Sequence, residues 1–148
     1  LDYVMSKRYI DLIREERGGT YSVSFNTEIY LISGYYESCV EFQTRPEMLE
    51  LLVADVYDEL HRAGWDGISQ EEFDNAVKYL RKVHMERQKR IANSVVSKNF
   101  ERHDQLKYGT CDIYDFDAVV SRIKTSDIEK LARKVYKSDK YRYILIEE

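Results

Sequence analysis

The sequence predicts an α+β fold in which an antiparallel sheet has helices packed on one face. Two short runs, residues 21–25 and 36–42, alternate apolar and polar side chains, the pattern of half-buried strands. Most other apolar residues recur at spacings of three and four, as on amphipathic helices. Helical patterns that surround a few strands indicate an α+β arrangement. With 148 residues and 43% hydrophobic content, the chain can bury a core, and we expect residues 1–148 to form a single domain.

The first expected element is a helix over residues 4–17, although its apolar stripe is less regular than a clean amphipathic face. Gly18 and Gly19 follow, a pair that ends helices in the left-handed conformation. The two alternating runs come next and should pair antiparallel, with a short turn at Ser33 and Gly34. We therefore expect the chain to double back from helix to strand at the glycine pair.

Helices are then expected in succession. Pro46 suits a first helical turn, and an apolar face follows it as far as Gly64. Ser69 and Glu72 form a capping box, so the longest helix should start there. The charged run at residues 86–90 indicates either that this helix leaves one core for another surface or that it simply has a solvated face.

The last third of the chain predicts three further helical segments and a final strand. The first segment, beyond residue 91, stops near Gly109, and a short helix covers residues 116–123. Ser126 and Glu129 cap the third. Its expected buried face consists of Ile128, Leu131, Ala132 and Val135. Residues 141–146 are strand-like.

Composition excludes several classes of function. A net charge of −4 with both signs interspersed argues against duplex nucleic acid as the main partner. The thirteen tyrosines are more typical of packing than of base stacking. No apolar run approaches the roughly eighteen residues of a membrane helix. Cys39 and Cys111 fit neither a disulfide framework nor a zinc ribbon, and the compartment stays open.

The chain lacks a metal motif of its own. A zinc peptidase of the inverted-motif kind needs His-x-x-Glu-His on one helix. The three histidines, His61, His84 and His103, are at least nineteen residues apart, so we expect no metal or other cofactor to bind this chain alone. Because the chain opens on Leu1 within a helical pattern, we interpret it as a piece of a longer polypeptide.

Arg14 and Tyr21 are the candidate site residues. They lie seven residues apart on either side of the glycine pair, so a helix end and a strand start can present them at one edge. A guanidinium fork beside a phenolic hydroxyl is suited to holding a peptide carbonyl or an oxyanion. The alternative is that Arg14 is an ordinary cation at a helix C-terminus and Tyr21 an ordinary strand aromatic.

Residues 12–23, Leu-Ile-Arg-Glu-Glu-Arg-Gly-Gly-Thr-Tyr-Ser-Val, resemble a stretch in the C-terminal half of the insulinase-type (pitrilysin-like) zinc metallopeptidases. Residues 67–73 resemble the start of that family's long helix, and residues 124–132 resemble the helix before its module's final strand. The resemblance implies that Arg14 and Tyr21 reach across a closed chamber towards the substrate. It also implies that the zinc belongs to the other, N-terminal lobe of the parent protein.

The resemblance therefore implies a substrate-binding, non-metal lobe of a zinc-dependent endopeptidase, inert alone. Its expected partners are a zinc-carrying lobe in the same or a partner chain and a peptide or protein substrate. A catalytically inactive paralogue that serves as a scaffold or docking subunit is the alternative. An unrelated α+β binding module is a third reading.

Overall fold

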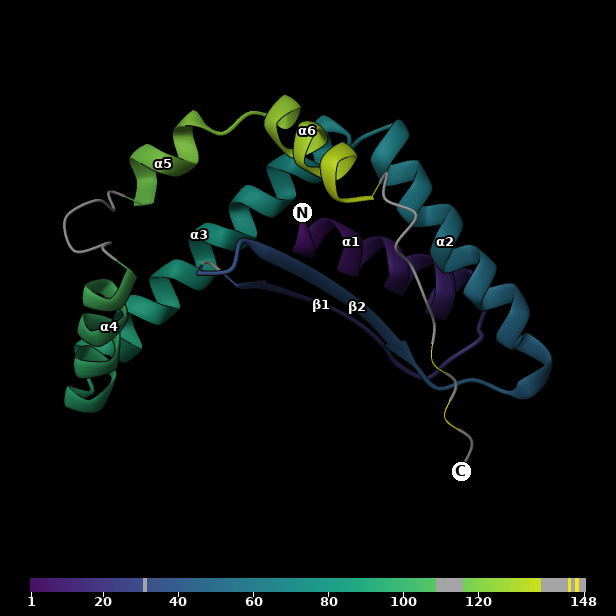
Figure 1. Ribbon diagram of the computed structural model, residues 1–148, viewed down its shortest axis with the longest axis horizontal. Helices are drawn as coiled ribbons and strands as arrows, with labels where there is room; N and C mark the ends of the chain where they lie inside the picture. Colours follow the sequence, from purple (N-terminus) through teal and green to yellow (C-terminus); the bar gives the residue numbers. More distant parts are fainter. Residues whose placement is uncertain (31, 109–115, 137–143, 145, 147–148) are drawn as a thin grey trace. The chain divides into compact units, whose positions relative to one another are not determined.

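The computed structural model describes residues 1–30, 32–108, 116–136, 144 and 146, and these residues form an α+β structure (Figure 1). The chain divides into two compact units, which are described separately below. The first unit comprises Leu1–Ser69 with Thr125–Glu148, and the second comprises Gln70–Lys124. The only sheet among the described residues is a two-stranded one, and it belongs to the first unit.

The first helical stretch is confirmed, but it has two geometries. An α-helix, α1, spans Asp2–Tyr9, and a π-helix, η1, continues it over Ile10–Glu16. The Arg17 N–H donates to the Leu12 carbonyl at 3.0 Å, which is an i→i−5 bond of the wide π kind. The fully buried side chains Met5, Tyr9 and Ile13 follow at intervals of four residues along this stretch.

The predicted antiparallel strand pair is also confirmed. β1 spans Val23–Tyr30 and β2 spans Tyr35–Phe42, with Phe25 opposite Val40. The turn between them uses Gly34 at φ 66°, and the Gly34 N–H donates to the Tyr30 carbonyl at 2.8 Å. Alternate residues of both strands are exposed, so helices cover one face of the hairpin only.

The expected start of the first strand at Tyr21 is wrong, because β1 begins two residues later, at Val23. The Thr20 hydroxyl donates to the Ser22 carbonyl at 2.8 Å and accepts from the Ser22 N–H at 3.3 Å. A local side-chain turn of this kind satisfies backbone groups that a strand would otherwise pair. At its other end β1 continues to Tyr30, beyond the predicted end at residue 25.

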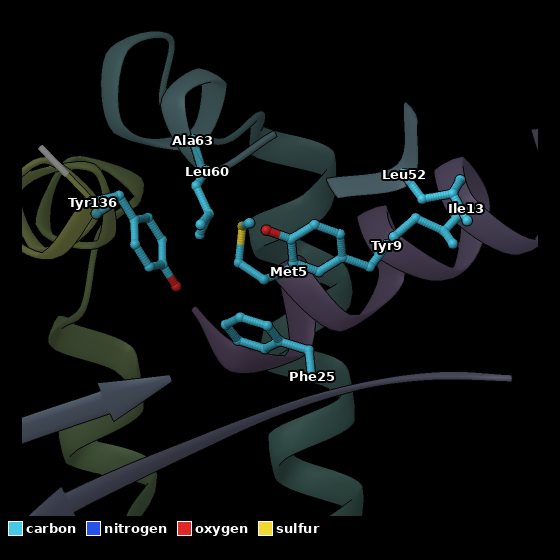
Figure 2. Packing of buried hydrophobic residues seen from close by; sticks show 9 residues of the cluster. Met5, Tyr9, Ile13, Phe25, Leu52, Leu60, Ala63 and Tyr136 are labelled. Carbon is cyan, nitrogen blue, oxygen red and sulfur yellow. The ribbon is translucent and has the colours of Figure 1, made fainter. Parts of the chain in front are cut away.

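The core of the first unit lies between the hairpin and three helical segments. After a short 3₁₀ turn, η2, at Pro46–Met48, helix α2 spans Leu49–Trp65, and helix α6 spans Thr125–Tyr136. Phe25 from β1 meets the ring of Tyr9 with centroids 5.5 Å apart. Figure 2 shows this cluster, which also contains Met5, Ile13, Leu52, Leu60, Ala63, Ala132 and Tyr136.

The predicted buried face of the last helix needs one correction. Leu131 is 41% exposed, whereas Ala132 and Tyr136 are buried. These two residues lie four apart on the line of contact with α2, and Leu131 is about 100° from Ala132 around the helix. A side chain at Gly64 of α2 would approach the Tyr136 Cβ to 3.4 Å, so the two helices approach closely at this point.

The described residues of the second unit form three helices. α3 spans Gln70–Ala92 directly after Ser69 and is the longest helix described, as the capping box predicted. α4 spans Val95–Tyr108 and α5 spans Phe116–Arg122, which confirms both expected segments. The predicted final strand falls largely outside the described residues, and Cys111 lies outside them altogether.

Candidate functional site

Arg14 lies in the last turn of η1, and its side chain points largely into solvent. The side chain is 53% exposed, and its Nε lies 3.4 Å from the carboxylate of the adjacent Glu15, itself 60% exposed. An ion pair this open to water contributes little stability. Most of the guanidinium's donors can therefore meet a ligand at small cost.

Tyr21 lies in the short segment between the glycine pair and β1, and 94% of its surface is exposed. So exposed a tyrosine contributes almost nothing to the core. Neither Arg14 nor Tyr21 is therefore a core residue. No hydrogen bond joins the two side chains, each of which lies in a described part of the chain.

The backbone between Arg14 and Tyr21 is anchored to α2 by an ion pair. Arg17 donates from Nε to Asp55 Oδ2 at 2.6 Å and from a second nitrogen to Oδ1 at 2.8 Å. This two-point geometry fixes both partners in orientation. The hydrogen bond that Arg17 donates to Asp55, together with the negative charge of that carboxylate, raises the pKa of Arg17 above its ordinary value. Asp55 is only 8% exposed, so it needs this partner to offset its desolvation.

The glycine turn is fixed from two further directions. Gly18 has φ 57°, a left-handed conformation that favours glycine. A Cβ on Gly19 would lie 2.6 Å from Leu52 Cδ1, so the backbone packs directly on the core. The Thr44 hydroxyl donates to the Gly19 carbonyl at 2.7 Å. Figure 2 shows Leu52 beside Ile13, the last buried residue before the turn.

A second set of contacts holds the preceding helix on α2. Arg8 donates to Glu59 Oε1 at 3.0 Å and to the Gly67 carbonyl at 3.0 Å. The Tyr9 hydroxyl donates to the Val56 carbonyl at 3.2 Å. The helical stretch from α1 to η1 is therefore attached to α2 on both sides of Arg14, through Arg8 and Tyr9 before it and through Arg17 after it.

Sequence reasoning missed these contacts, because their partners are 38 to 59 residues apart. A signal was present in α2: Asp55 and Glu59, four residues apart, lie on the side of the helix that also carries the buried Leu52. Carboxylates at buried helical positions require cationic partners. Arg17 meets this need at Asp55, and Arg8 and Arg62 meet it at Glu59.

The described residues contain no group of three or more His, Cys, Asp and Glu side chains able to hold a metal ion. His84 lies flat on Phe116, with ring centroids 3.9 Å apart.

Among the helices that the structure describes, none is long and apolar enough to span a membrane.

Comparison with known proteins assigns the family. A family model described as the peptidase M16 inactive domain matches residues 1–80. No curated protein matches the chain. The matched segment contains Arg14, Tyr21 and the contacts of Asp55 and Thr44 that fix the turn between them. Because the match covers more than half of the 148 residues, the chain belongs to the insulinase-like M16 peptidase family, as its inactive, non-metal half.

Proposed function

We propose that this chain is the substrate-binding lobe of a zinc-dependent endopeptidase and that the zinc lies in another lobe of the same or a partner chain. One observation within the family-matched segment carries the proposal: two exposed polar side chains extend from a backbone segment that other residues hold in place. Arg14 and Tyr21 present their polar groups to solvent, while Asp55 and Thr44 fix the backbone between them. A backbone that is held in place leaves only the side chains to be ordered when a substrate binds, which lowers the entropy cost of binding.

Each residue has a distinct role in this proposal. The Arg14 guanidinium donates to carbonyl groups of the peptide main chain, and it would exchange its exposed contact with Glu15 for them. The Tyr21 hydroxyl donates to the oxyanion that forms as water attacks the scissile carbonyl. The zinc lobe supplies the activated water, so the lobe described above hydrolyses nothing alone.

The test is steady-state kinetics of the full-length parent with single substitutions. Tyr21→Phe should lower kcat roughly a hundredfold, the scale of one oxyanion-hole donor. Arg14→Ala should chiefly raise KM, because it weakens peptide binding in the ground state. Both changes should alter the free energy of unfolding by less than about 1 kcal/mol, since neither side chain is buried.

Tyr35→Phe is the matched control, because Tyr35 is another exposed tyrosine and lies on β2. Its kinetics should equal those of the unmodified parent. If Tyr21→Phe leaves kcat unchanged in an active parent, Tyr21 is an ordinary surface aromatic. The family membership does not depend on that result.

A catalytically inactive paralogue that acts as a scaffold is the second candidate. The family model's own description as an inactive domain fits both readings. The two differ in the parent sequence: an active peptidase carries His-x-x-Glu-His with a downstream glutamate in its other lobe. A parent without that motif favours the scaffold.

A further inference from the structure

A basic stretch extends from Lys78 in α3 to Lys107 in α4. It contains nine Lys and Arg residues and three Asp and Glu residues, a formal charge of +6. Because the whole chain has a net charge of −4, the remaining residues sum to −10. All nine cationic residues are exposed. Residues 78–107 therefore form a strongly positive stretch in an otherwise acidic polypeptide, and one of their cations, Arg81, pairs with Asp117 at 2.7 Å.

Large apolar side chains are exposed within the same stretch. They are Met85, Val95, Val96, Phe100 and Leu106, between 56% and 74% exposed. No residue of α3 is buried. A monomeric surface seldom exposes so many apolar groups close together along the chain unless a partner covers them.

We propose that the basic arm, residues 78–107 of α3 and α4, is a docking surface for an acidic polypeptide segment that also carries apolar side chains. Such a segment complements the arm in charge and in hydrophobicity. Its carboxylates pair with the cations, and its apolar side chains cover Phe100 and its neighbours. This proposal is independent of Arg14 and Tyr21 and goes beyond the proposed function.

An anionic lipid bilayer and a nucleic acid fit the basic arm less well than an acidic polypeptide does. A lipid bilayer meets one side of a helix, whereas Arg87 and Lys89 lie about 200° apart around α3. A nucleic acid backbone neutralises cations but leaves Phe100 and Leu106 without an apolar partner surface. A polypeptide segment can follow the arm and cover both kinds of group.

The experiment is fluorescence anisotropy of the 148-residue chain with a labelled peptide that alternates Glu and Leu. The chain should bind this peptide, and added salt should weaken the binding because exposed charges are screened. A matched peptide with Gln in place of Glu should bind at least tenfold more weakly. Equal binding of the two peptides would overturn the proposal.

Charge reversal locates the site on the arm. The triple variant Arg87→Glu, Lys89→Glu and Arg90→Glu should lose at least tenfold in affinity for the Glu-Leu peptide. The matched control reverses three exposed cations of the first unit, Lys7→Glu, Arg45→Glu and Lys134→Glu, and should bind like the unmodified chain. Loss of affinity in the control, or none in the arm variant, would contradict the proposal.

Two further measurements test the chemistry of the partner. Phe100→Ser with Leu106→Ser should weaken peptide binding severalfold, while circular dichroism confirms that the helices persist. If the charge-reversed variant loses its helices, the same three positions changed to Gln give the test. Tighter binding of phosphatidylserine vesicles or of a single-stranded oligonucleotide than of the Glu-Leu peptide would also overturn the proposal.

Discussion

At the residue scale, the hairpin is joined to the last helix by two phenols, one half-buried and one buried. The hydroxyls of Tyr36 in β2 and Tyr136 in α6 lie 3.3 Å apart, and Tyr136 is 1% exposed. Burial is the main cause that raises the pKa of Tyr136 well above its ordinary value, and the hydrogen bond with Tyr36 adds to it. Burial likewise raises the pKa of Tyr36. At a pH at which the tyrosines of the unfolded chain lose their protons, both phenols therefore stay protonated in the folded chain.

This predicts a loss of stability at high pH. A raised folded-state pKa means that the stabilisation is complete below pH 10.0, the ordinary value, and declines above it as the unfolded phenols ionise. Above that pH, each such tyrosine can lower the free energy of unfolding by up to about 1.4 kcal/mol per pH unit. Tyr136→Phe removes one titrating group, so its free energy of unfolding should decline less steeply above that pH.

Urea unfolding at a series of pH values measures these slopes. Tyr21→Phe, which removes a hydroxyl from a side chain that is 94% exposed, is the matched control and should keep the wild-type slope. Identical slopes for Tyr136→Phe and the unmodified chain would mean that the Tyr136 phenol does not cause the loss of stability at high pH.

The turn at Gly19 connects packing to site geometry at the element scale. A methyl group on Gly19 would meet the Leu52 side chain at 2.6 Å, and because Leu52 is fully buried it could move aside only by displacing its core neighbours. Gly19→Ala should therefore destabilise the fold by about 1–3 kcal/mol, the usual range for overpacking. In a Leu52→Ala background the same change should cost much less, which a double-mutant cycle measured by thermal unfolding detects.

The reference substitution is Gly34→Ala in the hairpin turn, where a Cβ meets nothing within 4 Å. Its cost arises from the left-handed backbone alone, and it should be the same with Leu or Ala at position 52. Strict additivity of Gly19→Ala and Leu52→Ala would show that the turn does not rest on that side chain.

Elements were predictable from local patterns, whereas contacts between distant residues were not. Period-two alternation identified both strands, and the Ser69 capping box located α3. The boundary at Tyr21 was missed because the Thr20 hydroxyl competes for the backbone of Ser22. The part-buried pairs of Arg17 with Asp55 and of Arg8 with Glu59 depend on how the helices dock, which periodicity does not encode.

Arg14 and Tyr21 illustrate the same division. The glycine pair and the resemblance of residues 12–23 drew attention to both residues. The sequence did not reveal that α2 holds the intervening backbone through Asp55 and Leu52. Their role in binding substrate stays a prediction, because it concerns a ligand that reaches them from another lobe.

At the scale of the whole molecule, we expect this chain, as the proposed non-metal half of a peptidase, to hydrolyse no peptide in the absence of the zinc lobe. We expect the 148-residue chain to retain no stoichiometric zinc after extensive dialysis, because it lacks the paired histidines and glutamate of a zinc site. Elemental analysis measures this, and a fluorogenic peptide assay should show no hydrolysis. A retained equivalent of zinc, or hydrolysis that a chelator abolishes, would contradict the assignment.

The π-helix before the glycine turn has a consequence for sequence change. The buried residues Met5, Tyr9 and Ile13 recur every four positions, a spacing that drifts in one sense around an α-helix and in the opposite sense around the wider π turn. The two drifts offset each other and keep these side chains on one line. A one-residue deletion within Ile10–Glu16 would remove the wide turn and rotate Arg14 away from its present direction. Insertions and deletions should therefore be far less tolerated here than at the tip of the hairpin.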